Sequence, residues 1–322
     1  MTNDDHSELL EGDYRQLGRS EARPVASAVR SSLSGAKSVI VFASARGGSG
    51  KSLLTATLAG ALAAKGRKVG IIDADVDSPS IQAILGMRRA RVFSIDGGIE
   101  PAAGPLGLRV IAASMLAQTT AGDPFVVGAD PSAEADPPRG EVASAENGTP
   151  FAEERQDSPA LLARIFEQGR FGRLDFLFID LRSGIESIRT LARLQMTGGL
   201  LMVTAPSQLA TNSTRRAIDE ARRLRLPVWG IVENMVGFYC EHCRSVRPLF
   251  EEGGVASLAS ETNIPLLARL PFEPRLAAAG DRGILFTREY SNTPMAAQLL
   301  ELAKRIEELA LAAAKPGSSA TT

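Results

Sequence analysis

The chain has 322 residues, of which 44% are hydrophobic and 5% aromatic, and its formal net charge is −1. This apolar content is enough to bury a full core, and the low aromatic share favours an aliphatic α/β interior over a β-sandwich. The first thirty residues contain no apolar signal-peptide core, and no apolar run approaches the ~20 residues of a membrane helix. We therefore expect a cytoplasmic protein that does not bind membranes.

The small net charge hides an uneven distribution. Residues 118–158 carry nine acidic and two basic residues, and residues 1–36 carry six and four, which leaves +8 over the rest of the chain. A basic body suits anionic ligands, although it does not by itself separate a nucleotide from a nucleic acid.

Polar segments divide the chain. Residues 1–36 mix both charges without sustained periodicity, which predicts a flexible tail. Residues 118–158 hold five prolines and no lysine, and so polar a composition predicts a disordered insertion, because it buries too little surface to offset its ordering entropy. We expect one domain over residues 37–314 and a polar tail at residues 315–322.

The first predicted elements are a strand, a glycine loop and a helix. The apolar run at residues 39–42 is typical of a strand buried on both faces, and the sequence GGSGKS at residues 47–52 follows it. The glycines let several backbone N–H groups face one phosphate, Lys51 adds a positive charge, and Ser52 adds a hydroxyl for Mg²⁺. A glycine-rich connection that binds nothing is the alternative, and the strand–loop–helix context favours the phosphate site.

The helix that begins near Ser52 carries Leu54, Leu58 and Leu62 at four-residue spacing, and Gly66 is placed to end it. Its positive end faces the predicted phosphates.

A second strand, residues 68–72, ends at Asp73 and is followed closely by Asp75. Open α/β sheets bind ligands at the carboxyl ends of their strands, so these carboxylates are candidates to hold the Mg²⁺ hydration shell and to orient an attacking water. The alternative is an aspartate-rich turn that leads into a helix.

The later strands and helices alternate. Weak strand signals occur at residues 92–95 and 108–111. Stronger signals occur at residues 175–179, 200–204, 228–232 and 266–270. The first of these stronger runs closes on Asp180, the expected second Mg²⁺ anchor. A long amphipathic helix is expected over residues 294–314. The predicted fold is α/β, a doubly wound, mainly parallel sheet with helices on both faces.

One helix between these strands carries five arginines opposite its apolar face. The arginines are interrupted by Asp219 and Glu220, so a solvated surface is favoured over a nucleic-acid footprint.

The two cysteines, Cys240 and Cys243, lie in a C-x-x-C motif that is expected just after a strand and its connecting loop. A metal or cluster site needs two further thiolates, which a second copy of the chain would supply across a two-fold axis. A redox dithiol and an inert pair are equally open on spacing alone, and His242 is expected to be a bystander.

Several of these motifs together resemble a known family. The chain is similar to the Mrp/ApbC iron–sulfur cluster carrier ATPases, within the MinD/ParA class of deviant Walker A phosphate-loop NTPases. The resemblance is carried by the segments ASARGGSGKS, IIDADVDSPSIQAILGM, FLFID, IVENM, FYCEHC and FEEGGVASLASETNIPLLARLPFEP.

The resemblance implies a homodimer that binds ATP and Mg²⁺, carries a bridging [4Fe-4S] cluster on Cys240 and Cys243 of both subunits, and passes it to apoproteins. It implies Lys51, Asp75 and Arg46 as catalytic residues, with Arg46 reaching the partner's nucleotide. Ser52 and Asp180 are implied as Mg²⁺ ligands. The implied nucleotide-binding set is Gly47, Gly48, Ser49, Gly50, Lys51, Ser52, Asp73, Asp180, Asn234, Pro271 and Phe272.

The chain departs from the family at several positions. Arg46 replaces a lysine, Leu53 replaces a threonine, and Glu241 replaces a proline in the cysteine motif. Asp77 is an added carboxylate, and Leu181-Arg182-Ser183-Gly184 replaces a switch with two prolines, which removes a rigid turn. These changes make ATP binding a firmer expectation than hydrolysis, which is expected to be slow.

Three functions follow from these observations. The first is an ATP-dependent iron–sulfur carrier, favoured by the phosphate loop and the cysteines together. The second is a partitioning or scaffold ATPase, suggested by the basic body and the arginine helix. The third is a nucleotide sensor that does not hydrolyse ATP, suggested by the altered switch. We expect the first, with nucleic acid an unlikely partner.

Overall fold

The computed structural model describes residues 35–95, 98–116, 158–194, 198–240, 242–243, 245–249 and 254–313. The tail predicted at residues 1–36 and the insertion predicted at residues 118–158 lie outside these ranges except for Gly35, Ala36 and Ser158, as does the tail at residues 315–322. The division into one domain and flexible segments therefore stays a prediction.

The described residues form a nine-stranded sheet. Its strands are β1 (Ala36–Ala43), β2 (Val69–Ala74), β5 (Ala102–Ala103), β6 (Arg109–Ala112), β7 (Leu174–Leu181), β8 (Gly199–Thr204), β9 (Val228–Cys240), β10 (Ser245–Pro248) and β11 (Leu266–Phe272). They pair in the order β10-β9-β8-β1-β7-β2-β6-β5, with β11 also on β9. Only β5 and β10 run antiparallel to their neighbours, and β3 (Phe93–Ile95) with β4 (Gly98–Glu100) forms a separate hairpin.

The central strands are buried on both faces because most of their residues are apolar. Every residue of β2 and β8 is buried, and β1 and β7 are exposed only near their first residues. Such continuous apolar runs are typical of parallel strands covered by helices on both sides. The strands predicted from these runs and the α/β fold class are confirmed.

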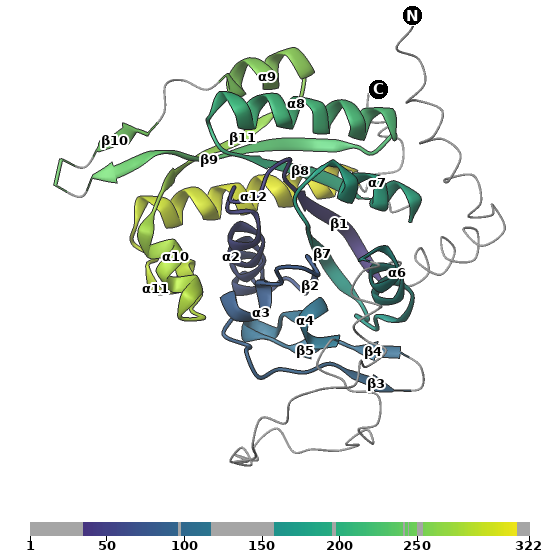
Figure 1. Ribbon diagram of the computed structural model, residues 1–322. Helices are drawn as coiled ribbons and strands as arrows, with labels where there is room; N and C mark the ends of the chain where they lie inside the picture. Colours follow the sequence, from purple (N-terminus) through teal and green to yellow (C-terminus); the bar gives the residue numbers. More distant parts are fainter. Residues whose placement is uncertain are drawn as a thin grey trace, which may run out of the picture.

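Helices cover the sheet on both faces (Figure 1). They are α2 (Lys51–Ala64), α3 (Ile81–Ile84), α4 (Ala113–Leu116), α6 (Ser158–Gln168), α7 (Ile185–Arg193), α8 (Gln208–Arg223), α9 (Val255–Thr262), α10 (Pro274–Asp281), α11 (Phe286–Glu289) and α12 (Pro294–Ala313), with a 3₁₀ turn at Pro105–Gly107. Helices α2 and α12 pack against each other and against β1, whereas α8 packs against α7, α9, β8 and β9. Among the described residues, no helix is long and apolar enough to cross a membrane.

Helix α2 occupies the centre of one helical layer. Its leucines Leu54, Leu58 and Leu62 are all buried, as their spacing predicts. The chain leaves the helix after Ala64, and Gly66 adopts a φ of 82°, a left-handed conformation that favours glycine.

Strand β9 differs from the prediction, which ended it near Val232. It continues to Cys240 because β11 pairs with it from Ile231 as far as Phe238, and β10 pairs with its last residues. The cysteine motif therefore begins on the strand itself rather than after a connecting loop.

The arginine-rich helix is α8. Its apolar side, which includes Ala217 and Ile218, is buried against the sheet. Two of its arginines form ion pairs, Arg215 with Glu261 and Arg223 with Glu220, each at 2.6 Å. These acidic partners neutralise part of the positive charge that the sequence places on this face.

Candidate functional site

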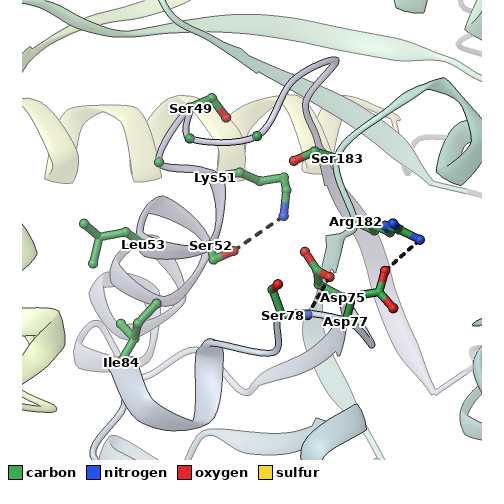
Figure 2. A pocket seen from close by; sticks show the side chains of 13 residues that line it. Ser49, Lys51, Ser52, Leu53, Asp75, Asp77, Ser78, Ile84, Arg182 and Ser183 are labelled. Atoms are coloured by element: carbon green, nitrogen blue, oxygen red, sulfur yellow. Dashed lines mark hydrogen bonds and ion pairs between the residues drawn. The ribbon is translucent and has the colours of Figure 1, made fainter. Parts of the chain in front are cut away.

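The loops that follow β1, β2 and β7 enclose a pocket of about 520 Å³ at the carboxyl edge of the sheet (Figure 2). The glycine loop and the start of α2 form one wall, and the segments after β2 and β7 form the opposite wall. The lining residues are Gly47, Gly48, Ser49, Gly50, Lys51, Ser52, Leu53, Asp75, Asp77, Ser78, Ile84, Arg182 and Ser183.

The glycine loop requires glycine at two positions. Gly48 and Gly50 have φ values of 78° and 80°, which side chains other than glycine rarely adopt. A Cβ on Gly50 would lie 2.4 Å from Nδ2 of Asn234, and this Nδ2 donates a hydrogen bond of 2.9 Å to the carbonyl of Ser49. Asn234, on β9, thus packs against the glycine loop and stabilises its backbone.

Lys51 is buried and paired. Its side chain is 5% exposed, and Nζ lies 2.6 Å from Oδ1 of Asp180, which is fully buried. Nζ also lies 3.5 Å from the Ser52 hydroxyl, and Thr55 donates to the same Asp180 oxygen at 3.3 Å. Sequence reasoning missed Thr55, although its position one helical turn after Lys51 was a usable signal.

Two buried polar atoms at this site make no hydrogen bond within the described part of the chain: Oδ2 of Asp180 and Oγ of Ser49. Buried polar groups are nearly always satisfied, so an open oxygen here suits an absent ligand. A carboxylate oxygen beside the Ser52 hydroxyl is a donor set that suits Mg²⁺. The residues present therefore fit the metal that the phosphate loop implies.

Asp73 and Asp180 are neighbours in register on β2 and β7, and both are fully buried. Burial and the charge of Asp180 raise the pKa of Asp73 from 3.8 to about 7. Burial also raises the pKa of Asp180, whereas Lys51 favours its charged form. Burial and mutual repulsion therefore favour protonation within this pair of carboxylates.

The Asp73 carboxylate does not line the pocket. It accepts hydrogen bonds from the backbone N–H groups of Asp75 at 3.1 Å, Ser80 at 2.9 Å and Ile81 at 3.0 Å. Asp73 thus holds the turn into α3, which was the alternative interpretation of this aspartate-rich segment. Asp75 does line the pocket, and its carboxylate accepts from the Ser78 N–H at 3.1 Å.

Arg46 lies outside the phosphate pocket. It is exposed and lines a second cavity of about 140 Å³. This cavity lies between the glycine loop and residues of β8 and α8. Pro271 and Phe272 form the end of β11 and line neither cavity. The structure thus brings most of the implied phosphate and Mg²⁺ residues together with Asn234, whereas Pro271 and Phe272 line neither of these cavities.

The segment after β7 is held in place without prolines. The Ser183 hydroxyl lies 2.9 Å from that of Ser44, and the Gly184 N–H donates to the Ser44 carbonyl at 2.8 Å. Arg182 forms an ion pair with Asp77, with 2.7 Å between Nη1 and Oδ2. Sequence reasoning noted both departures from the family pattern but not that the two side chains meet.

The cysteine motif lies at the end of the β9–β10 hairpin, which projects from the sheet in Figure 1. Cys240 is the last residue of β9 and pairs in register with Ser245, while Cys243 lies in the turn. The Cys243 sulfur is exposed and lies 2.9 Å from the Ser245 hydroxyl. Among the described residues, no three His, Cys, Asp or Glu side chains gather into a metal-binding group.

A family model identifies the family of this chain. The model for the ParA family, described as NUBPL iron-transfer P-loop NTPase, matches residues 35–128 and 156–307. The chain belongs to this family. The match to the NUBPL/ParA family includes the glycine loop, the carboxylates and the cysteine hairpin.

Proteins similar in sequence to this NUBPL/ParA chain are named as iron–sulfur cluster carriers or assembly factors. An iron–sulfur cluster carrier protein of Saccharolobus solfataricus is 29% identical over 91% of this chain and 90% of its own length. The cytosolic Fe–S cluster assembly factor NUBP2 of Homo sapiens is 30% identical over 87% of this chain and 96% of its own length.

Solved structures agree on the fold. A nucleotide-binding protein of Archaeoglobus fulgidus, solved in complex with ADP, has a TM-score of 0.65 and 26% identity over 85% of this chain and 96% of its own. The cell division ATPase MinD of Pyrococcus furiosus has a TM-score of 0.56 and 20% identity over 84% and 99%, respectively, and shows a shared fold alone.

Proposed function

We propose that this protein is an ATP-binding iron–sulfur carrier that holds a [4Fe-4S] cluster between two copies of the chain and passes it to apoproteins. One observation carries the proposal: β9 serves both candidate sites. Asn234 on this strand contacts the glycine loop, and Cys240 ends the same strand six residues later. At about 3.3 Å per residue the two points lie at most about 20 Å apart along β9, which has a register shift between Asn234 and Phe238 and a left-handed φ of 64° at Met235.

The nucleotide site is proposed to bind ATP through the N–H groups of residues 47–52 and the Lys51 ammonium. Mg²⁺, held by Ser52 and the open Oδ2 of Asp180, would neutralise the phosphate charge. Lys51 would exchange its buried partner Asp180 for phosphate oxygens, which leaves Asp180 for the metal. Asn234, Pro271 and Phe272 are proposed to contact the base.

Slow ATP hydrolysis is proposed as part of this function. Asp75 lines the pocket opposite the glycine loop, where its carboxylate can orient an attacking water. Arg46 is exposed beside the loop and is proposed to reach the nucleotide of the partner subunit. Steady turnover that is lost in Lys51→Ala would support this step, and turnover that persists in the variant would contradict it.

The cluster is cargo and is proposed to bind Cys240 and Cys243 of both subunits. Two thiolates from each copy complete a four-thiolate site, which one copy cannot do. The exposure of Cys243 at the end of a projecting hairpin supports such a shared site, because a second copy and a recipient protein can both approach it.

Anaerobic reconstitution with iron and sulfide tests the proposal. We expect about four irons per dimer with a broad charge-transfer absorption band in the wild type, and loss of both in Cys240→Ser and in Cys243→Ser. His242→Ala, which changes the residue before Cys243, is the matched control and should retain the cluster. A wild-type protein that holds no iron would exclude the carrier function and leave a scaffold or sensor ATPase.

A further inference from the structure

Two pocket residues outside the phosphate-loop motif contact each other at one wall of the pocket. Asp77 follows β2 and Arg182 follows β7, and Nη1 of Arg182 lies 2.7 Å from Oδ2 of Asp77. Both side chains are about half exposed, at 47% and 56%, and both line the phosphate pocket. Figure 2 shows the pair at one side of the pocket, on the wall opposite the glycine loop.

The position of this wall determines which phosphate it can meet. Phosphate loops cradle the inner phosphates with their N–H groups, while the loop lysine reaches the outer ones. In this chain the loop and Lys51 line one wall, so the terminal phosphate of a bound triphosphate points toward the wall that carries Arg182. A diphosphate lacks this terminal phosphate.

The charges of the wall make Arg182 necessary for such a ligand. Asp75 and Asp77 both line it, and their carboxylates repel a polyphosphate. Among the described residues that line this pocket, the cations are Lys51 and Arg182. A guanidinium binds phosphate oxygens through two parallel hydrogen bonds, so it suits the terminal phosphate well.

Arg182 can leave Asp77 and bind another anion at a small cost in free energy. Exposed ion pairs contribute little to stability because water screens both charges. The backbone of the loop is nevertheless fixed, since Ser183 and Gly184 are hydrogen-bonded to Ser44 at the end of β1. Arg182 can therefore turn its side chain toward a phosphate without a rearrangement of the loop.

We propose that Arg182 binds the terminal phosphate of a nucleoside triphosphate held by its own chain, and that Asp77 holds the guanidinium at the pocket wall until the nucleotide arrives. This inference rests on the proposed nucleotide binding. It assigns Arg182 the discrimination between triphosphate and diphosphate, and it assigns Asp77 the role of a competing anion.

Equilibrium titrations of the full chain with a slowly hydrolysed ATP analogue and with ADP, both with Mg²⁺, test the inference. In Arg182→Ala we expect the dissociation constant of the ATP analogue to rise about 10- to 100-fold, the range for loss of a charge-assisted hydrogen bond, and that of ADP to change less than about threefold. In Arg182→Lys the loss for the ATP analogue should be partial, because a point charge replaces the fork.

Asp77→Ala separates a phosphate ligand from a structural ion pair. It should bind the ATP analogue as tightly as the wild type or more tightly, because a competing carboxylate is removed. The matched control is Arg193→Ala at the far end of α7, an arginine of similar exposure that is paired with Glu186. It should bind both nucleotides as the wild type does.

Three results would overturn the inference. The first is equal binding of the ATP analogue by wild type and Arg182→Ala, and the second is an equal loss for both nucleotides. The third is a loss in Asp77→Ala as large as in Arg182→Ala, which would make the pair a structural bridge. If the wild type binds neither nucleotide, the proposed ATP binding fails as well, which the wild-type titration alone reveals.

Discussion

Asp73 and Asp180 illustrate how single residues in this site serve both stability and chemistry. They lie side by side on β2 and β7, fully buried, and Asp180 is paired with Lys51, which lines the pocket. Three backbone N–H groups bind Asp73, so its carboxylate shapes the turn that presents Asp75. Asp180 keeps an oxygen open for a ligand.

The raised pKa of Asp73 predicts a pH-dependent stability. In the unfolded chain this carboxyl has its ordinary pKa of 3.8, whereas in the folded chain the pKa is about 7. Between these values the folded state binds more protons, so the free energy of unfolding should fall as the pH rises from about 4 to 7, by up to about 1.4 kcal/mol per pH unit. Urea denaturation of the nucleotide-free, Mg²⁺-free protein over this range measures the slope.

Asp73→Asn is the matched variant for this measurement. It removes one titrating group while it retains one carbonyl oxygen as an acceptor, so the variant should lose part of the slope, and Asp180, whose pKa is also raised by burial, should account for the remainder. The same slope in both proteins would show that Asp73 is not the group responsible.

At the level of elements, β9 connects the glycine loop to the cysteine hairpin. Its Asn234 fills the space beside Gly50, and its Gly237 passes so close to β10 that a Cβ would lie 2.5 Å from the Arg247 carbonyl. Both glycines are therefore required by packing against a neighbouring element, in addition to any preference of their own backbone.

Gly50→Ala should destabilise the protein more than Gly48→Ala. Both positions have a left-handed φ, which costs an alanine about 1–2 kcal/mol, but only the Cβ at Gly50 meets a neighbour, since nothing lies within 4 Å of one at Gly48. Thermal denaturation measures the difference. The double variant Gly50→Ala/Asn234→Ala should be less destabilised than the sum of its single changes, and strict additivity would contradict the contact.

Gly237→Val should disrupt the hairpin more than the nucleotide site. A side chain cannot displace the Arg247 backbone cheaply, so the pairing of β9 with β10 should loosen and reconstituted iron should fall well below about four per dimer. ATP affinity should fall by a smaller factor than the iron content, because the residues that line the phosphate pocket lie on other elements and β9 reaches the glycine loop only through Asn234. Full iron retention would show that the cysteines do not need the hairpin.

At the level of the whole molecule, one sheet assembles both sites. The strands β1, β7 and β2 are adjacent and parallel, so the loops that follow them share one edge. The same sheet extends through β8 to β9 and the hairpin. The buried apolar residues on both faces of this sheet form one connected core. We therefore expect the described residues to unfold cooperatively as one unit.

Phe178→Ala tests this shared core. Phe178 on β7 is fully buried, with its ring 5.1 Å from that of Phe42 on β1. The cavity should lower the free energy of unfolding by about 3–5 kcal/mol in a single denaturant transition. Leu311→Ala, at a side chain 53% exposed on α12, should change it by less than about 0.5 kcal/mol. Two separate transitions in Phe178→Ala would contradict a common core.

The sequence alone was sufficient for the fold class, the central strands and the phosphate loop. These features depend on local patterns: apolar runs of strand length, leucines at helical spacing in α2, and glycines before Lys51. Local patterns determine backbone conformation and burial directly, so they can be interpreted before any tertiary contact is known.

Only the tertiary structure decided which side chains meet. Asp73 turned inward to bind backbone N–H groups, β9 continued to Cys240 because β10 and β11 pair with it, and Arg182 met Asp77 from a distant part of the chain. Each outcome depends on contacts between segments far apart in sequence, and such contacts follow from strand order and register. Residue spacing carries no information about them, because the same local pattern can be placed beside many different neighbours.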